Sequence, residues 1–198
     1  MPKDAVTLDI GANIGIMTVY LAKKAPKGQV YAYEPIPANF KILEKITQLF
    51  KLKNAQLFKH ALGDEDKEIE MVLPIEDSVK LQGLGHVIHD TIEDFNEGEH
   101  FKTISCQLDS LDYLMSKNIS GIKIDVENFE YFVFKGGENL IKKNKPIIYC
   151  ELWENENRTR CFNLLSSLGY EIKILHKHSL IPFDTDTHKA LNFFFIPR

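Results

Sequence analysis

Residues 6–15 read Val-Thr-Leu-Asp-Ile-Gly-Ala-Asn-Ile-Gly, and this stretch decides the fold. Its first five residues form an apolar run of the length of a buried β-strand. Gly11 and Gly15 follow, four residues apart, and this spacing lets the backbone turn tightly and approach a ligand with no side chain in the way. Apolar residues then recur at helical spacing as far as Lys24, and Asn13 has the residue type of a helix N-cap. The stretch therefore predicts a strand, a ligand-binding glycine loop and a helix.

The same alternation of short apolar runs and longer amphipathic runs continues along the chain. Further strands are expected at residues 29–34, 55–60, 121–126, 147–151, 170–175 and 191–196, and helices at 37–50, 108–115, 130–142 and 157–168. Strands that alternate with helices favour an α/β fold, with a mostly parallel sheet covered by helices on both faces. The 198 residues have the length of a single domain, residues 1–198.

One segment interrupts this rhythm. Residues 61–100 contain twelve acidic residues and only two lysines, whereas residues 1–60 contain nine lysines and four acidic residues. The acidic stretch has several glycines and few large apolar side chains. We interpret residues 64–103 as a solvated insertion on the globular frame, with a lid over the ligand site as the alternative.

The overall composition is that of an ordinary globular protein, and it excludes several classes. The net charge of −4 gives no general reason to expect nucleic acid or an anionic membrane as a partner. No apolar run approaches the length of a membrane span, and the first residues do not form a signal peptide. Cys106, Cys150 and Cys161 are widely spaced, which predicts buried thiols in a reducing, cytoplasmic compartment.

Glu34 ends the second expected strand and stands 23 residues after Gly11. A carboxylate at this place can accept hydrogen bonds from both hydroxyls of a ribose. The loop does not match the dinucleotide fingerprint Gly-x-Gly-x-x-Gly, because Asn13 and Ile16 stand at its second and third glycines. The glycine loop and Glu34 together predict an adenosine-type cofactor. A nicotinamide-dependent oxidoreductase is the disfavoured alternative.

Charged residues end the strand expected at 121–126. Strand alternation would place Lys123, Asp125 and Glu127 on one face, across the crevice from the glycine loop. Charges at the end of a buried strand are costly unless they are paired or used. They are therefore either functional groups or a lysine–carboxylate pair that only orders the loop. His86 and His89 have the spacing of a metal pair, but we expect no metal site because no third ligand is apparent.

The order of these motifs resembles that of one known family. The motifs are Asp9-x-Gly-Ala-Asn-x-Gly15, Tyr33-Glu34-Pro35-x-Pro37-x-Asn39-Phe40, Ala61-Leu62-Gly63, Ser110-Leu111-Asp112, Lys123-Ile-Asp-Val-Glu127 and Asn192-Phe193. Over essentially the whole chain they are similar to the FkbM family of S-adenosylmethionine-dependent methyltransferases. The resemblance implies a class I methyltransferase fold, with a seven-stranded sheet of order 3-2-1-4-5-7-6 and an antiparallel last strand.

The resemblance also implies which residues hold S-adenosylmethionine. The loop of residues 11–15 would wrap the methionine part, Glu34 would bind the ribose, and residues 61–64 would flank the adenine. Asp125 would contact the amino group of the cofactor or the acceptor. The expected cofactor residues are Asp9, Gly11, Asn13, Gly15, Glu34, Ala61, Leu62, Asp64 and Asp125.

The chemistry of methyl transfer suggests the catalytic residues. A sulfonium methyl group is a strong electrophile, so the protein must mainly align an acceptor oxygen and remove its proton. We expect Glu127 or Asp125 to be the base, with Lys123 orienting both, and histidines as rivals. Family members usually carry Gly after the Lys-Ile-Asp-Val-Glu motif, where this chain has Asn128. Asn is the other residue that best tolerates a left-handed backbone.

The resemblance implies a hydroxyl as the acceptor, and the polar, acidic loops favour that of a sugar or glycan. A polyketide or lipid hydroxyl is the alternative acceptor, and a catalytically weak cofactor-binding domain is the alternative function. Family members often carry a helical lead-in before the first strand, and this chain lacks one. One domain of a longer polypeptide is therefore a further interpretation.

Overall fold

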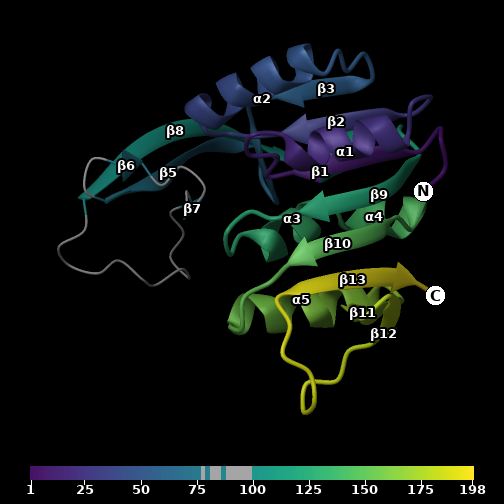
Figure 1. Cartoon of the computed structure of the whole chain (residues 1–198). Helices are drawn as coiled ribbons and strands as arrows, with labels where there is room; N and C mark the ends of the chain where they lie inside the picture. Colours follow the sequence, from purple (N-terminus) through teal and green to yellow (C-terminus); the bar gives the residue numbers. More distant parts are fainter. Residues whose placement is uncertain (77–78, 81–85, 88–99) are drawn as a thin grey trace.

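The computed structural model describes residues 1–76, 79–80, 86–87 and 100–198, and it describes the side chains of residues 1–71 and 103–198 (Figure 1). The strands are β1 (Val6–Ile10), β2 (Gln29–Tyr33), β3 (Ala55–Phe58), β4 (Ala61–Gly63), β5 (Lys67–Glu76), β6 (Val79–Lys80), β7 (His86–Val87), β8 (His100–Ser110), β9 (Ile119–Ile124), β10 (Ile147–Glu151), β11 (Tyr170–His176), β12 (Ser179–Pro182) and β13 (Asn192–Pro197). The helices are α1 (Ile16–Lys24), α2 (Pro37–Leu49), α3 (Glu130–Gly136), α4 (Glu138–Asn144) and α5 (Glu156–Ser167), with a 3₁₀ turn η2 (Leu111–Leu114).

Eight strands form the main sheet in the order β12-β11-β13-β10-β9-β1-β2-β3. The neighbouring strands β3, β2, β1, β9 and β10 run parallel to one another. β13 runs antiparallel between β10 and β11. When the strands of this sheet are numbered in chain order without β12, they follow the predicted order 3-2-1-4-5-7-6 from the β3 edge to β11. The predicted number of seven is wrong, because β12 folds back on β11 as an eighth strand. Lys177 makes this turn possible with a left-handed φ of 55°.

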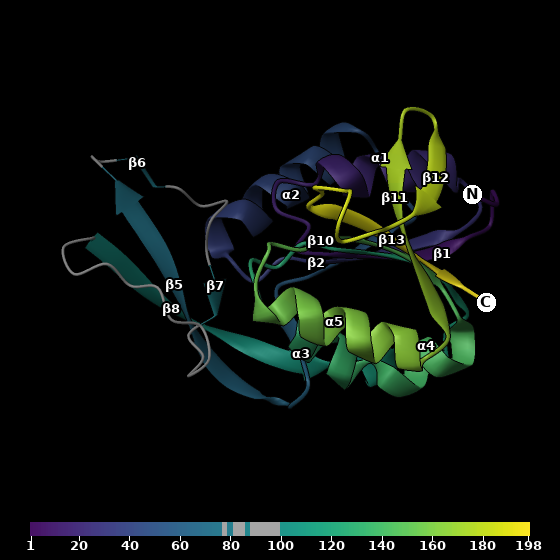
Figure 2. The same ribbon diagram turned by 90° about the horizontal axis from the view of Figure 1, so that it is seen from below.

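Helices cover the two faces of the sheet unequally. Figure 2 shows α1 and α2 on one face and α3, α4 and α5 on the other. The β11–β12 hairpin curls toward the face that carries α1 and α2. The central strands bury their apolar side chains against these layers, and Leu8, Ile122, Ile148 and Phe195 are at most 3 % exposed. All three cysteines are free and buried, as predicted.

A second sheet replaces much of the predicted insertion. β5 and β8 pair antiparallel over most of their length, and β4 pairs parallel with β8. Ile69 and Met71 on β5 and Cys106 and Leu108 on β8 are buried, so alternate residues of both strands face the core. Residues 67–71, which lie within the segment interpreted as solvated, thus form part of a sheet with one side toward the core. Acidic residues at the intervening positions made the stretch look solvated in the sequence, although its apolar residues alternate as in a strand.

Two predicted helices also change. The helix expected at 130–142 divides into α3 and α4 at Gly136 and Gly137, where the chain packs closely on Gly63 and Leu111. The helix expected at 108–115 is only the turn η2, because Leu108 still belongs to β8. Within the described part of the chain, no helix is both long and apolar enough to cross a membrane.

Close packing at Gly136 yields a test of the contact between α3 and β4. A Cβ atom at Gly136 would lie 1.7 Å from the carbonyl oxygen of Gly63, which is backbone and cannot give way cheaply. We expect Gly136→Ala to lower the free energy of unfolding by more than about 2 kcal/mol, although alanine favours a helix by about 1 kcal/mol. Urea denaturation measures this change. Gly121→Ala is the control, because its Cβ meets nothing nearer than 3.6 Å. Equal stability of the two variants would contradict this packing.

Candidate functional site

The glycine loop joins β1 to α1 and contains three left-handed residues. The φ angle is 71° at Gly11, 50° at Asn13 and 94° at Gly15. Gly11 is tightly enclosed, because a Cβ atom there would lie 1.8 Å from the backbone oxygen of Asp125. Helix α1 begins only at Ile16, with Gly15 at the cap position and no side-chain cap. The prediction that Asn13 caps this helix is wrong, since its left-handed backbone belongs to the loop before the cap.

The Glu34 carboxylate follows β2 and holds the glycine loop. Its Oε2 accepts a hydrogen bond from the N–H of Asn13 at 2.8 Å, and its Oε1 accepts one from the N–H of Ile36 at 3.0 Å. Asn39 Nδ2 donates to the same Oε1 at 3.3 Å. Burial raises the pKa of Glu34 above its usual value, against these three donors. A carboxylate has about four lone-pair sites, so Oε2, with one donor, retains capacity for a ligand hydroxyl.

The ammonium group of Lys123 lies between β1 and β9. Its Nζ donates to the carbonyl oxygen of Gly11 at 2.6 Å and lies 3.6 Å from Asp9 Oδ1 and 3.7 Å from Asp125 Oδ2. Asp9 is completely buried, and its Oδ2 accepts a hydrogen bond from Thr18 Oγ1 at 2.6 Å. Burial raises the pKa of the Asp9 carboxyl, although the Lys123 ammonium opposes this. Lys123 therefore makes the loop-ordering contacts of a lysine–carboxylate pair.

The chain leaves β9 at Ile124, two residues earlier than predicted. Glu127 and Asn128 then adopt consecutive left-handed conformations, with φ of 52° and 72°. Strand alternation therefore does not place Glu127 beside Lys123 and Asp125, and that reason for grouping the three residues was wrong. The tolerance expected of Asn128 for a left-handed backbone is confirmed.

Glu130, in the first turn of α3, holds this strained loop. Its Oε1 accepts hydrogen bonds from the N–H groups of Val126 at 3.2 Å and Asn128 at 3.3 Å, and its Oε2 accepts one from Asn157 Nδ2 at 2.6 Å. The side chain is 2 % exposed, and burial raises the pKa of Glu130 to about 7. Glu130 lies outside the motifs predicted to form the site. An acidic side chain just after a loop, where a helix begins, was the available signal.

Glu127 differs from an ordinary surface carboxylate. Burial, together with the neighbouring carboxylates of Asp125, Glu130 and Glu151, raises the pKa of Glu127 to about 7, although the Lys123 ammonium opposes this. A group with this pKa exchanges a proton near neutral pH. Such a pKa suits general acid–base catalysis.

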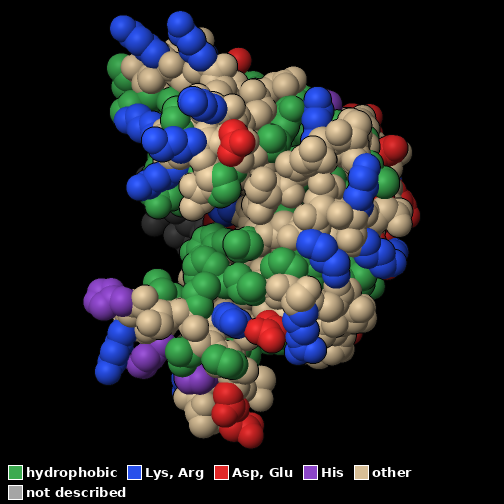
Figure 3. Space-filling view, turned by 90° about the vertical axis from the view of Figure 1, so that its right-hand side faces the viewer, with side chains coloured by type: hydrophobic (Ala, Val, Ile, Leu, Met, Phe, Trp, Pro, Cys, Tyr) green, Lys and Arg blue, Asp and Glu red, His purple; other side chains and the backbone are tan. Residues whose placement is uncertain are grey.

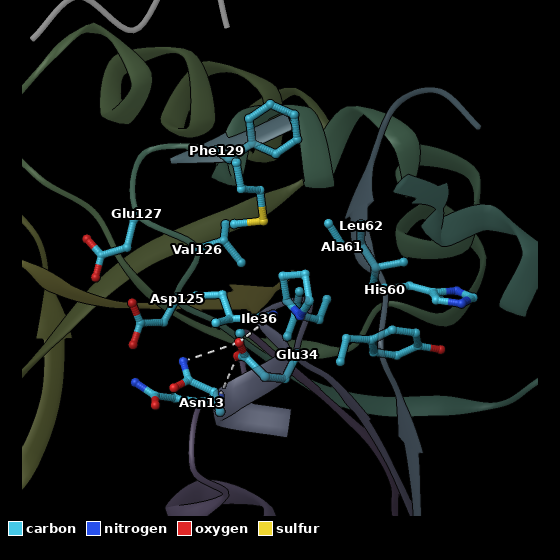
Figure 4. A pocket seen from close by; sticks show the side chains of 16 residues that line it. Asn13, Glu34, Ile36, His60, Ala61, Leu62, Asp125, Val126, Glu127 and Phe129 are labelled. Atoms are coloured by element: carbon cyan, nitrogen blue, oxygen red, sulfur yellow. Dashed lines mark hydrogen bonds between the residues drawn. The ribbon is translucent and has the colours of Figure 1, made fainter. Parts of the chain in front are cut away.

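The ends of β1, β2, β4 and β9 meet around one pocket (Figure 4). The carboxylates of Asp125 and Glu127 lie on one side of it, and the His60 ring lies on the opposite side. Seven predicted site residues line this pocket: Gly11, Asn13, Glu34, Ala61, Leu62, Asp125 and Glu127. Residues that the motifs placed far apart in the chain are thus neighbours in space.

The other predicted site residues lie outside the lining. Lys123 donates to the carbonyl oxygen of Gly11 and forms an ion pair with Asp9, so both residues support the glycine loop. Gly15 packs against Leu43. Asp64 instead forms an ion pair with Lys135 on α3, with Nζ and Oδ2 2.7 Å apart. The structure therefore gives Asp64 a partner on α3 rather than a place in the pocket.

Several residues that line the pocket lie outside the predicted site. Ile36 and Phe129 are apolar neighbours of the predicted motifs, and Met71 comes from β5, which was interpreted as part of a solvated segment. His60 lines the pocket, and its Nδ1 lies 2.5 Å from Asp109 Oδ2. Only the pairing of β5 with β8 brings Met71 to this wall.

The metal and lid hypotheses fall largely on undescribed residues. Among the described residues, no group of three or more His, Cys, Asp and Glu side chains is arranged to hold a metal ion. His89 lies outside the described residues, and the side chain of His86 is not described either. Residues 88–99, which contain much of the acidic stretch, also lie outside them.

The sheet order and the site define a class of protein. The class I methyltransferases share this arrangement: a mostly parallel sheet with an antiparallel strand, here β13, between two parallel ones near its edge, a glycine loop after β1 and a carboxylate after β2. The match to the methyltransferase FkbM domain extends over residues 9–188. The chain belongs to this family.

Individual proteins agree with the methyltransferase class and with the FkbM family. "Methyltransferase 1" of Beauveria bassiana is 28 % identical over 149 residues, which are 68 % of this chain and 59 % of that protein. The methyltransferase FkbM of Methylobacillus flagellatus superposes on 98 % of this chain with a TM-score of 0.65 and 15 % identity, and the match covers 44 % of its length. A Streptococcus mutans protein solved in complex with SAH has a TM-score of 0.56 and 9 % identity over 98 % of this chain and 89 % of its own. The chain thus spans less than two thirds of the first two proteins.

The buried carboxyls predict how stability depends on pH. The pKa values of Glu127 and Glu130 are each about 7 in the folded protein, against an ordinary value of 4.5. The folded chain thus binds more protons than the unfolded chain between these values, so the free energy of unfolding falls as pH rises through this interval. We expect Glu130→Gln to remove the contribution of one carboxyl to this fall. The slope of the free energy of unfolding against pH should then be shallower by about 1.4 kcal/mol per pH unit, in the range where the folded group stays protonated. Urea denaturation at several pH values tests this, and an unchanged slope would contradict it.

Proposed function

We propose that this chain binds S-adenosylmethionine in the pocket and transfers its methyl group to a hydroxyl of a sugar or glycan. One observation carries the proposal. The glycine loop and the Glu34 carboxylate lie on the same pocket as Asp125 and Glu127. A ligand held by the first pair therefore has its reacting end within reach of the second.

The residues present suit the cofactor. Gly11 lines the pocket with backbone atoms alone, and Glu34 Oε2 keeps a free acceptor site for a ribose hydroxyl. Ala61 and Leu62 offer an apolar wall for the adenine. The surrounding carboxylates outnumber the Lys123 ammonium, which favours a cationic sulfonium ligand. The Streptococcus mutans protein of similar fold, solved with SAH, agrees with this choice.

Glu127 is the proposed base. The bound cofactor would supply an electrophilic methyl group, so the chain itself has to orient the acceptor and take its proton. Glu127, with a pKa of about 7, can accept that proton near neutral pH. Lys123 keeps Asp125 and the glycine loop in place through its contacts with both.

Side chains beyond the carboxyl end of β10 support a sugar acceptor. Trp153 follows this strand and is 44 % exposed, and its side chain forms a hydrogen bond with Glu151. Glu151 in turn is close enough to Glu127 to raise the pKa of Glu127. An exposed aromatic face beside carboxylates suits a sugar, since its C–H face packs on the ring and its hydroxyls donate to the acids.

The cofactor proposal predicts binding and its dependence on Glu34. S-adenosylhomocysteine should bind and raise the thermal unfolding temperature, whereas NAD should do neither. Glu34→Gln should weaken binding by about 1–3 kcal/mol, because a ribose hydroxyl loses a charged acceptor. Isothermal titration calorimetry measures both ligands. Glu138→Gln on α4 is the matched control. Wild-type affinity in Glu34→Gln would remove this residue from the site.

The base proposal predicts a defect confined to turnover. Glu127→Gln should keep its affinity for S-adenosylhomocysteine while the rate of methyl transfer falls by about 10²–10⁴-fold. In the wild-type protein the rate should rise with pH to a plateau above about pH 7, because only the ionised carboxylate accepts a proton. Transfer from methyl-labelled cofactor to a panel of oligosaccharides measures the rate, with apolar hydroxy compounds as the competing class. Full activity in Glu127→Gln would transfer the role to another group, and transfer only to the apolar compounds would overturn the sugar proposal.

A further inference from the structure

The net negative charge of the chain conceals a strongly basic surface. Six exposed lysines lie at the amino ends of β1, β2 and β3, and we refer to this surface as the basic edge: Lys3, Lys23, Lys24, Lys27, Lys51 and Lys53. Figure 3 looks onto this end of the sheet and shows lysines gathered over the part formed by α1 and α2.

Hydrogen bonds join the three segments of the basic edge into one surface. The N–H of Lys27 donates to the carbonyl oxygen of Lys3 at 2.8 Å. Asn54 Nδ2 donates to the carbonyl oxygens of Ala22 and Ala25, at 3.0 and 2.8 Å, and so fastens the end of α1 to the segment before β3. The backbone segments that carry the lysines therefore keep fixed positions relative to one another.

The positive charge of the basic edge is not neutralised. None of its six lysines forms an ion pair with a described residue. Among the acidic residues of the first sixty, Asp9 and Glu34 are buried at the opposite end of the sheet, and only Asp4 and Glu44 are exposed. Folding thus separates Asp9 and Glu34 from the lysines, whereas Asp4 adjoins Lys3 in the sequence. The average charge of the chain does not reveal this separation.

Large apolar side chains protrude among these lysines. Leu49 is 73 % exposed, Tyr20 54 % and Phe50 43 %. The Lys23 ammonium lies 4.2 Å from the centre of the Phe50 ring, and the Lys24 ammonium lies 5.5 Å from that of Tyr20. The basic edge therefore combines cationic groups with apolar side chains that water solvates poorly.

We propose that the basic edge binds the surface of an anionic phospholipid bilayer. Lysine ammonium groups would approach the anionic headgroups, and Leu49 and Phe50 would enter the boundary of the acyl chains. An aliphatic side chain at the most exposed position suits lipid better than nucleic acid, because it cannot stack on a base. Arginine is the residue that makes bidentate contacts with the phosphates of nucleic acid, and Arg158, Arg160 and Arg198 all lie outside the basic edge. The absence of arginine from the basic edge also favours lipid.

The polarity of the sheet makes this binding compatible with the proposed activity. The basic edge lies at the amino ends of the strands, and the pocket lies at their carboxyl ends. A chain bound through the basic edge would therefore direct its pocket away from the bilayer. The inference does not depend on the proposed function.

Vesicle co-sedimentation of the full chain tests the proposal. The chain should sediment with vesicles of phosphatidylcholine and phosphatidylserine and stay in solution with phosphatidylcholine alone, and added salt should weaken the binding. Lys27→Gln with Lys53→Gln should lower the partition coefficient about fivefold for each lysine removed. Leu49→Gln should lower it as well. Lys177→Gln with Lys189→Gln, on exposed positions near the opposite edge of the sheet, is the matched control and should change nothing.

Three results would overturn the proposal. One is the absence of binding to anionic vesicles, and another is equal loss of binding in the control pair. The third is tighter binding to polyuridylate than to vesicles without any effect of Leu49→Gln, which would assign the basic edge to nucleic acid. Thermal unfolding of each variant shows that these losses do not come from misfolding.

Discussion

The Lys123 ammonium is the contact on which the site depends. β1 and β9 lie side by side in parallel, with Asp9 opposite Lys123, and this register brings an acid and a base together inside the protein. A buried carboxylate that loses its partner costs about 3–5 kcal/mol, so neither charge is tolerable alone. The same ammonium donates to the carbonyl oxygen of Gly11. The glycine loop therefore rests on a charge pair that the central strands create.

Backbone strain at the end of β9 is a second consequence of this arrangement. Glu127 and Asn128 both lie in the left-handed region, which costs about 1–2 kcal/mol for each residue other than glycine. Glu130 offsets that cost by accepting two backbone hydrogen bonds from the loop. The loop in turn carries Glu127 into a partly buried position beside other carboxylates, where its pKa rises to about 7. The shape of the loop and the proton chemistry of Glu127 thus have one origin.

A parallel sheet also separates the chemistry of its two ends. The carboxyl ends of the strands gather Asp9, Glu34, Asp125 and Glu127 around one buried ammonium. The amino ends of the first three strands carry exposed lysines that form no ion pair with a described residue. Each end therefore has a charge that the net value of −4 does not indicate. This polarity lets the two ends of one sheet present a pocket and a separate charged surface without overlap.

The family resemblance implied the order of the main sheet and the places of Ala61 and Leu62. Short-range patterns were enough to predict the strand–glycine loop–helix unit and five of the residues that line the pocket. Those predictions hold because left-handed turns and buried strands require particular residue types within a few positions. Three features became apparent only in the folded chain. They are strand β5 within the acidic stretch at residues 67–76, the hairpin strand β12, and the end of β9 before Asp125. The sequence also could not show that Glu130 would hold the loop or that Asp64 would pair with Lys135. Burial, hydrogen bonding and pKa values depend on neighbours distant in the chain, and only the tertiary structure brings those neighbours together.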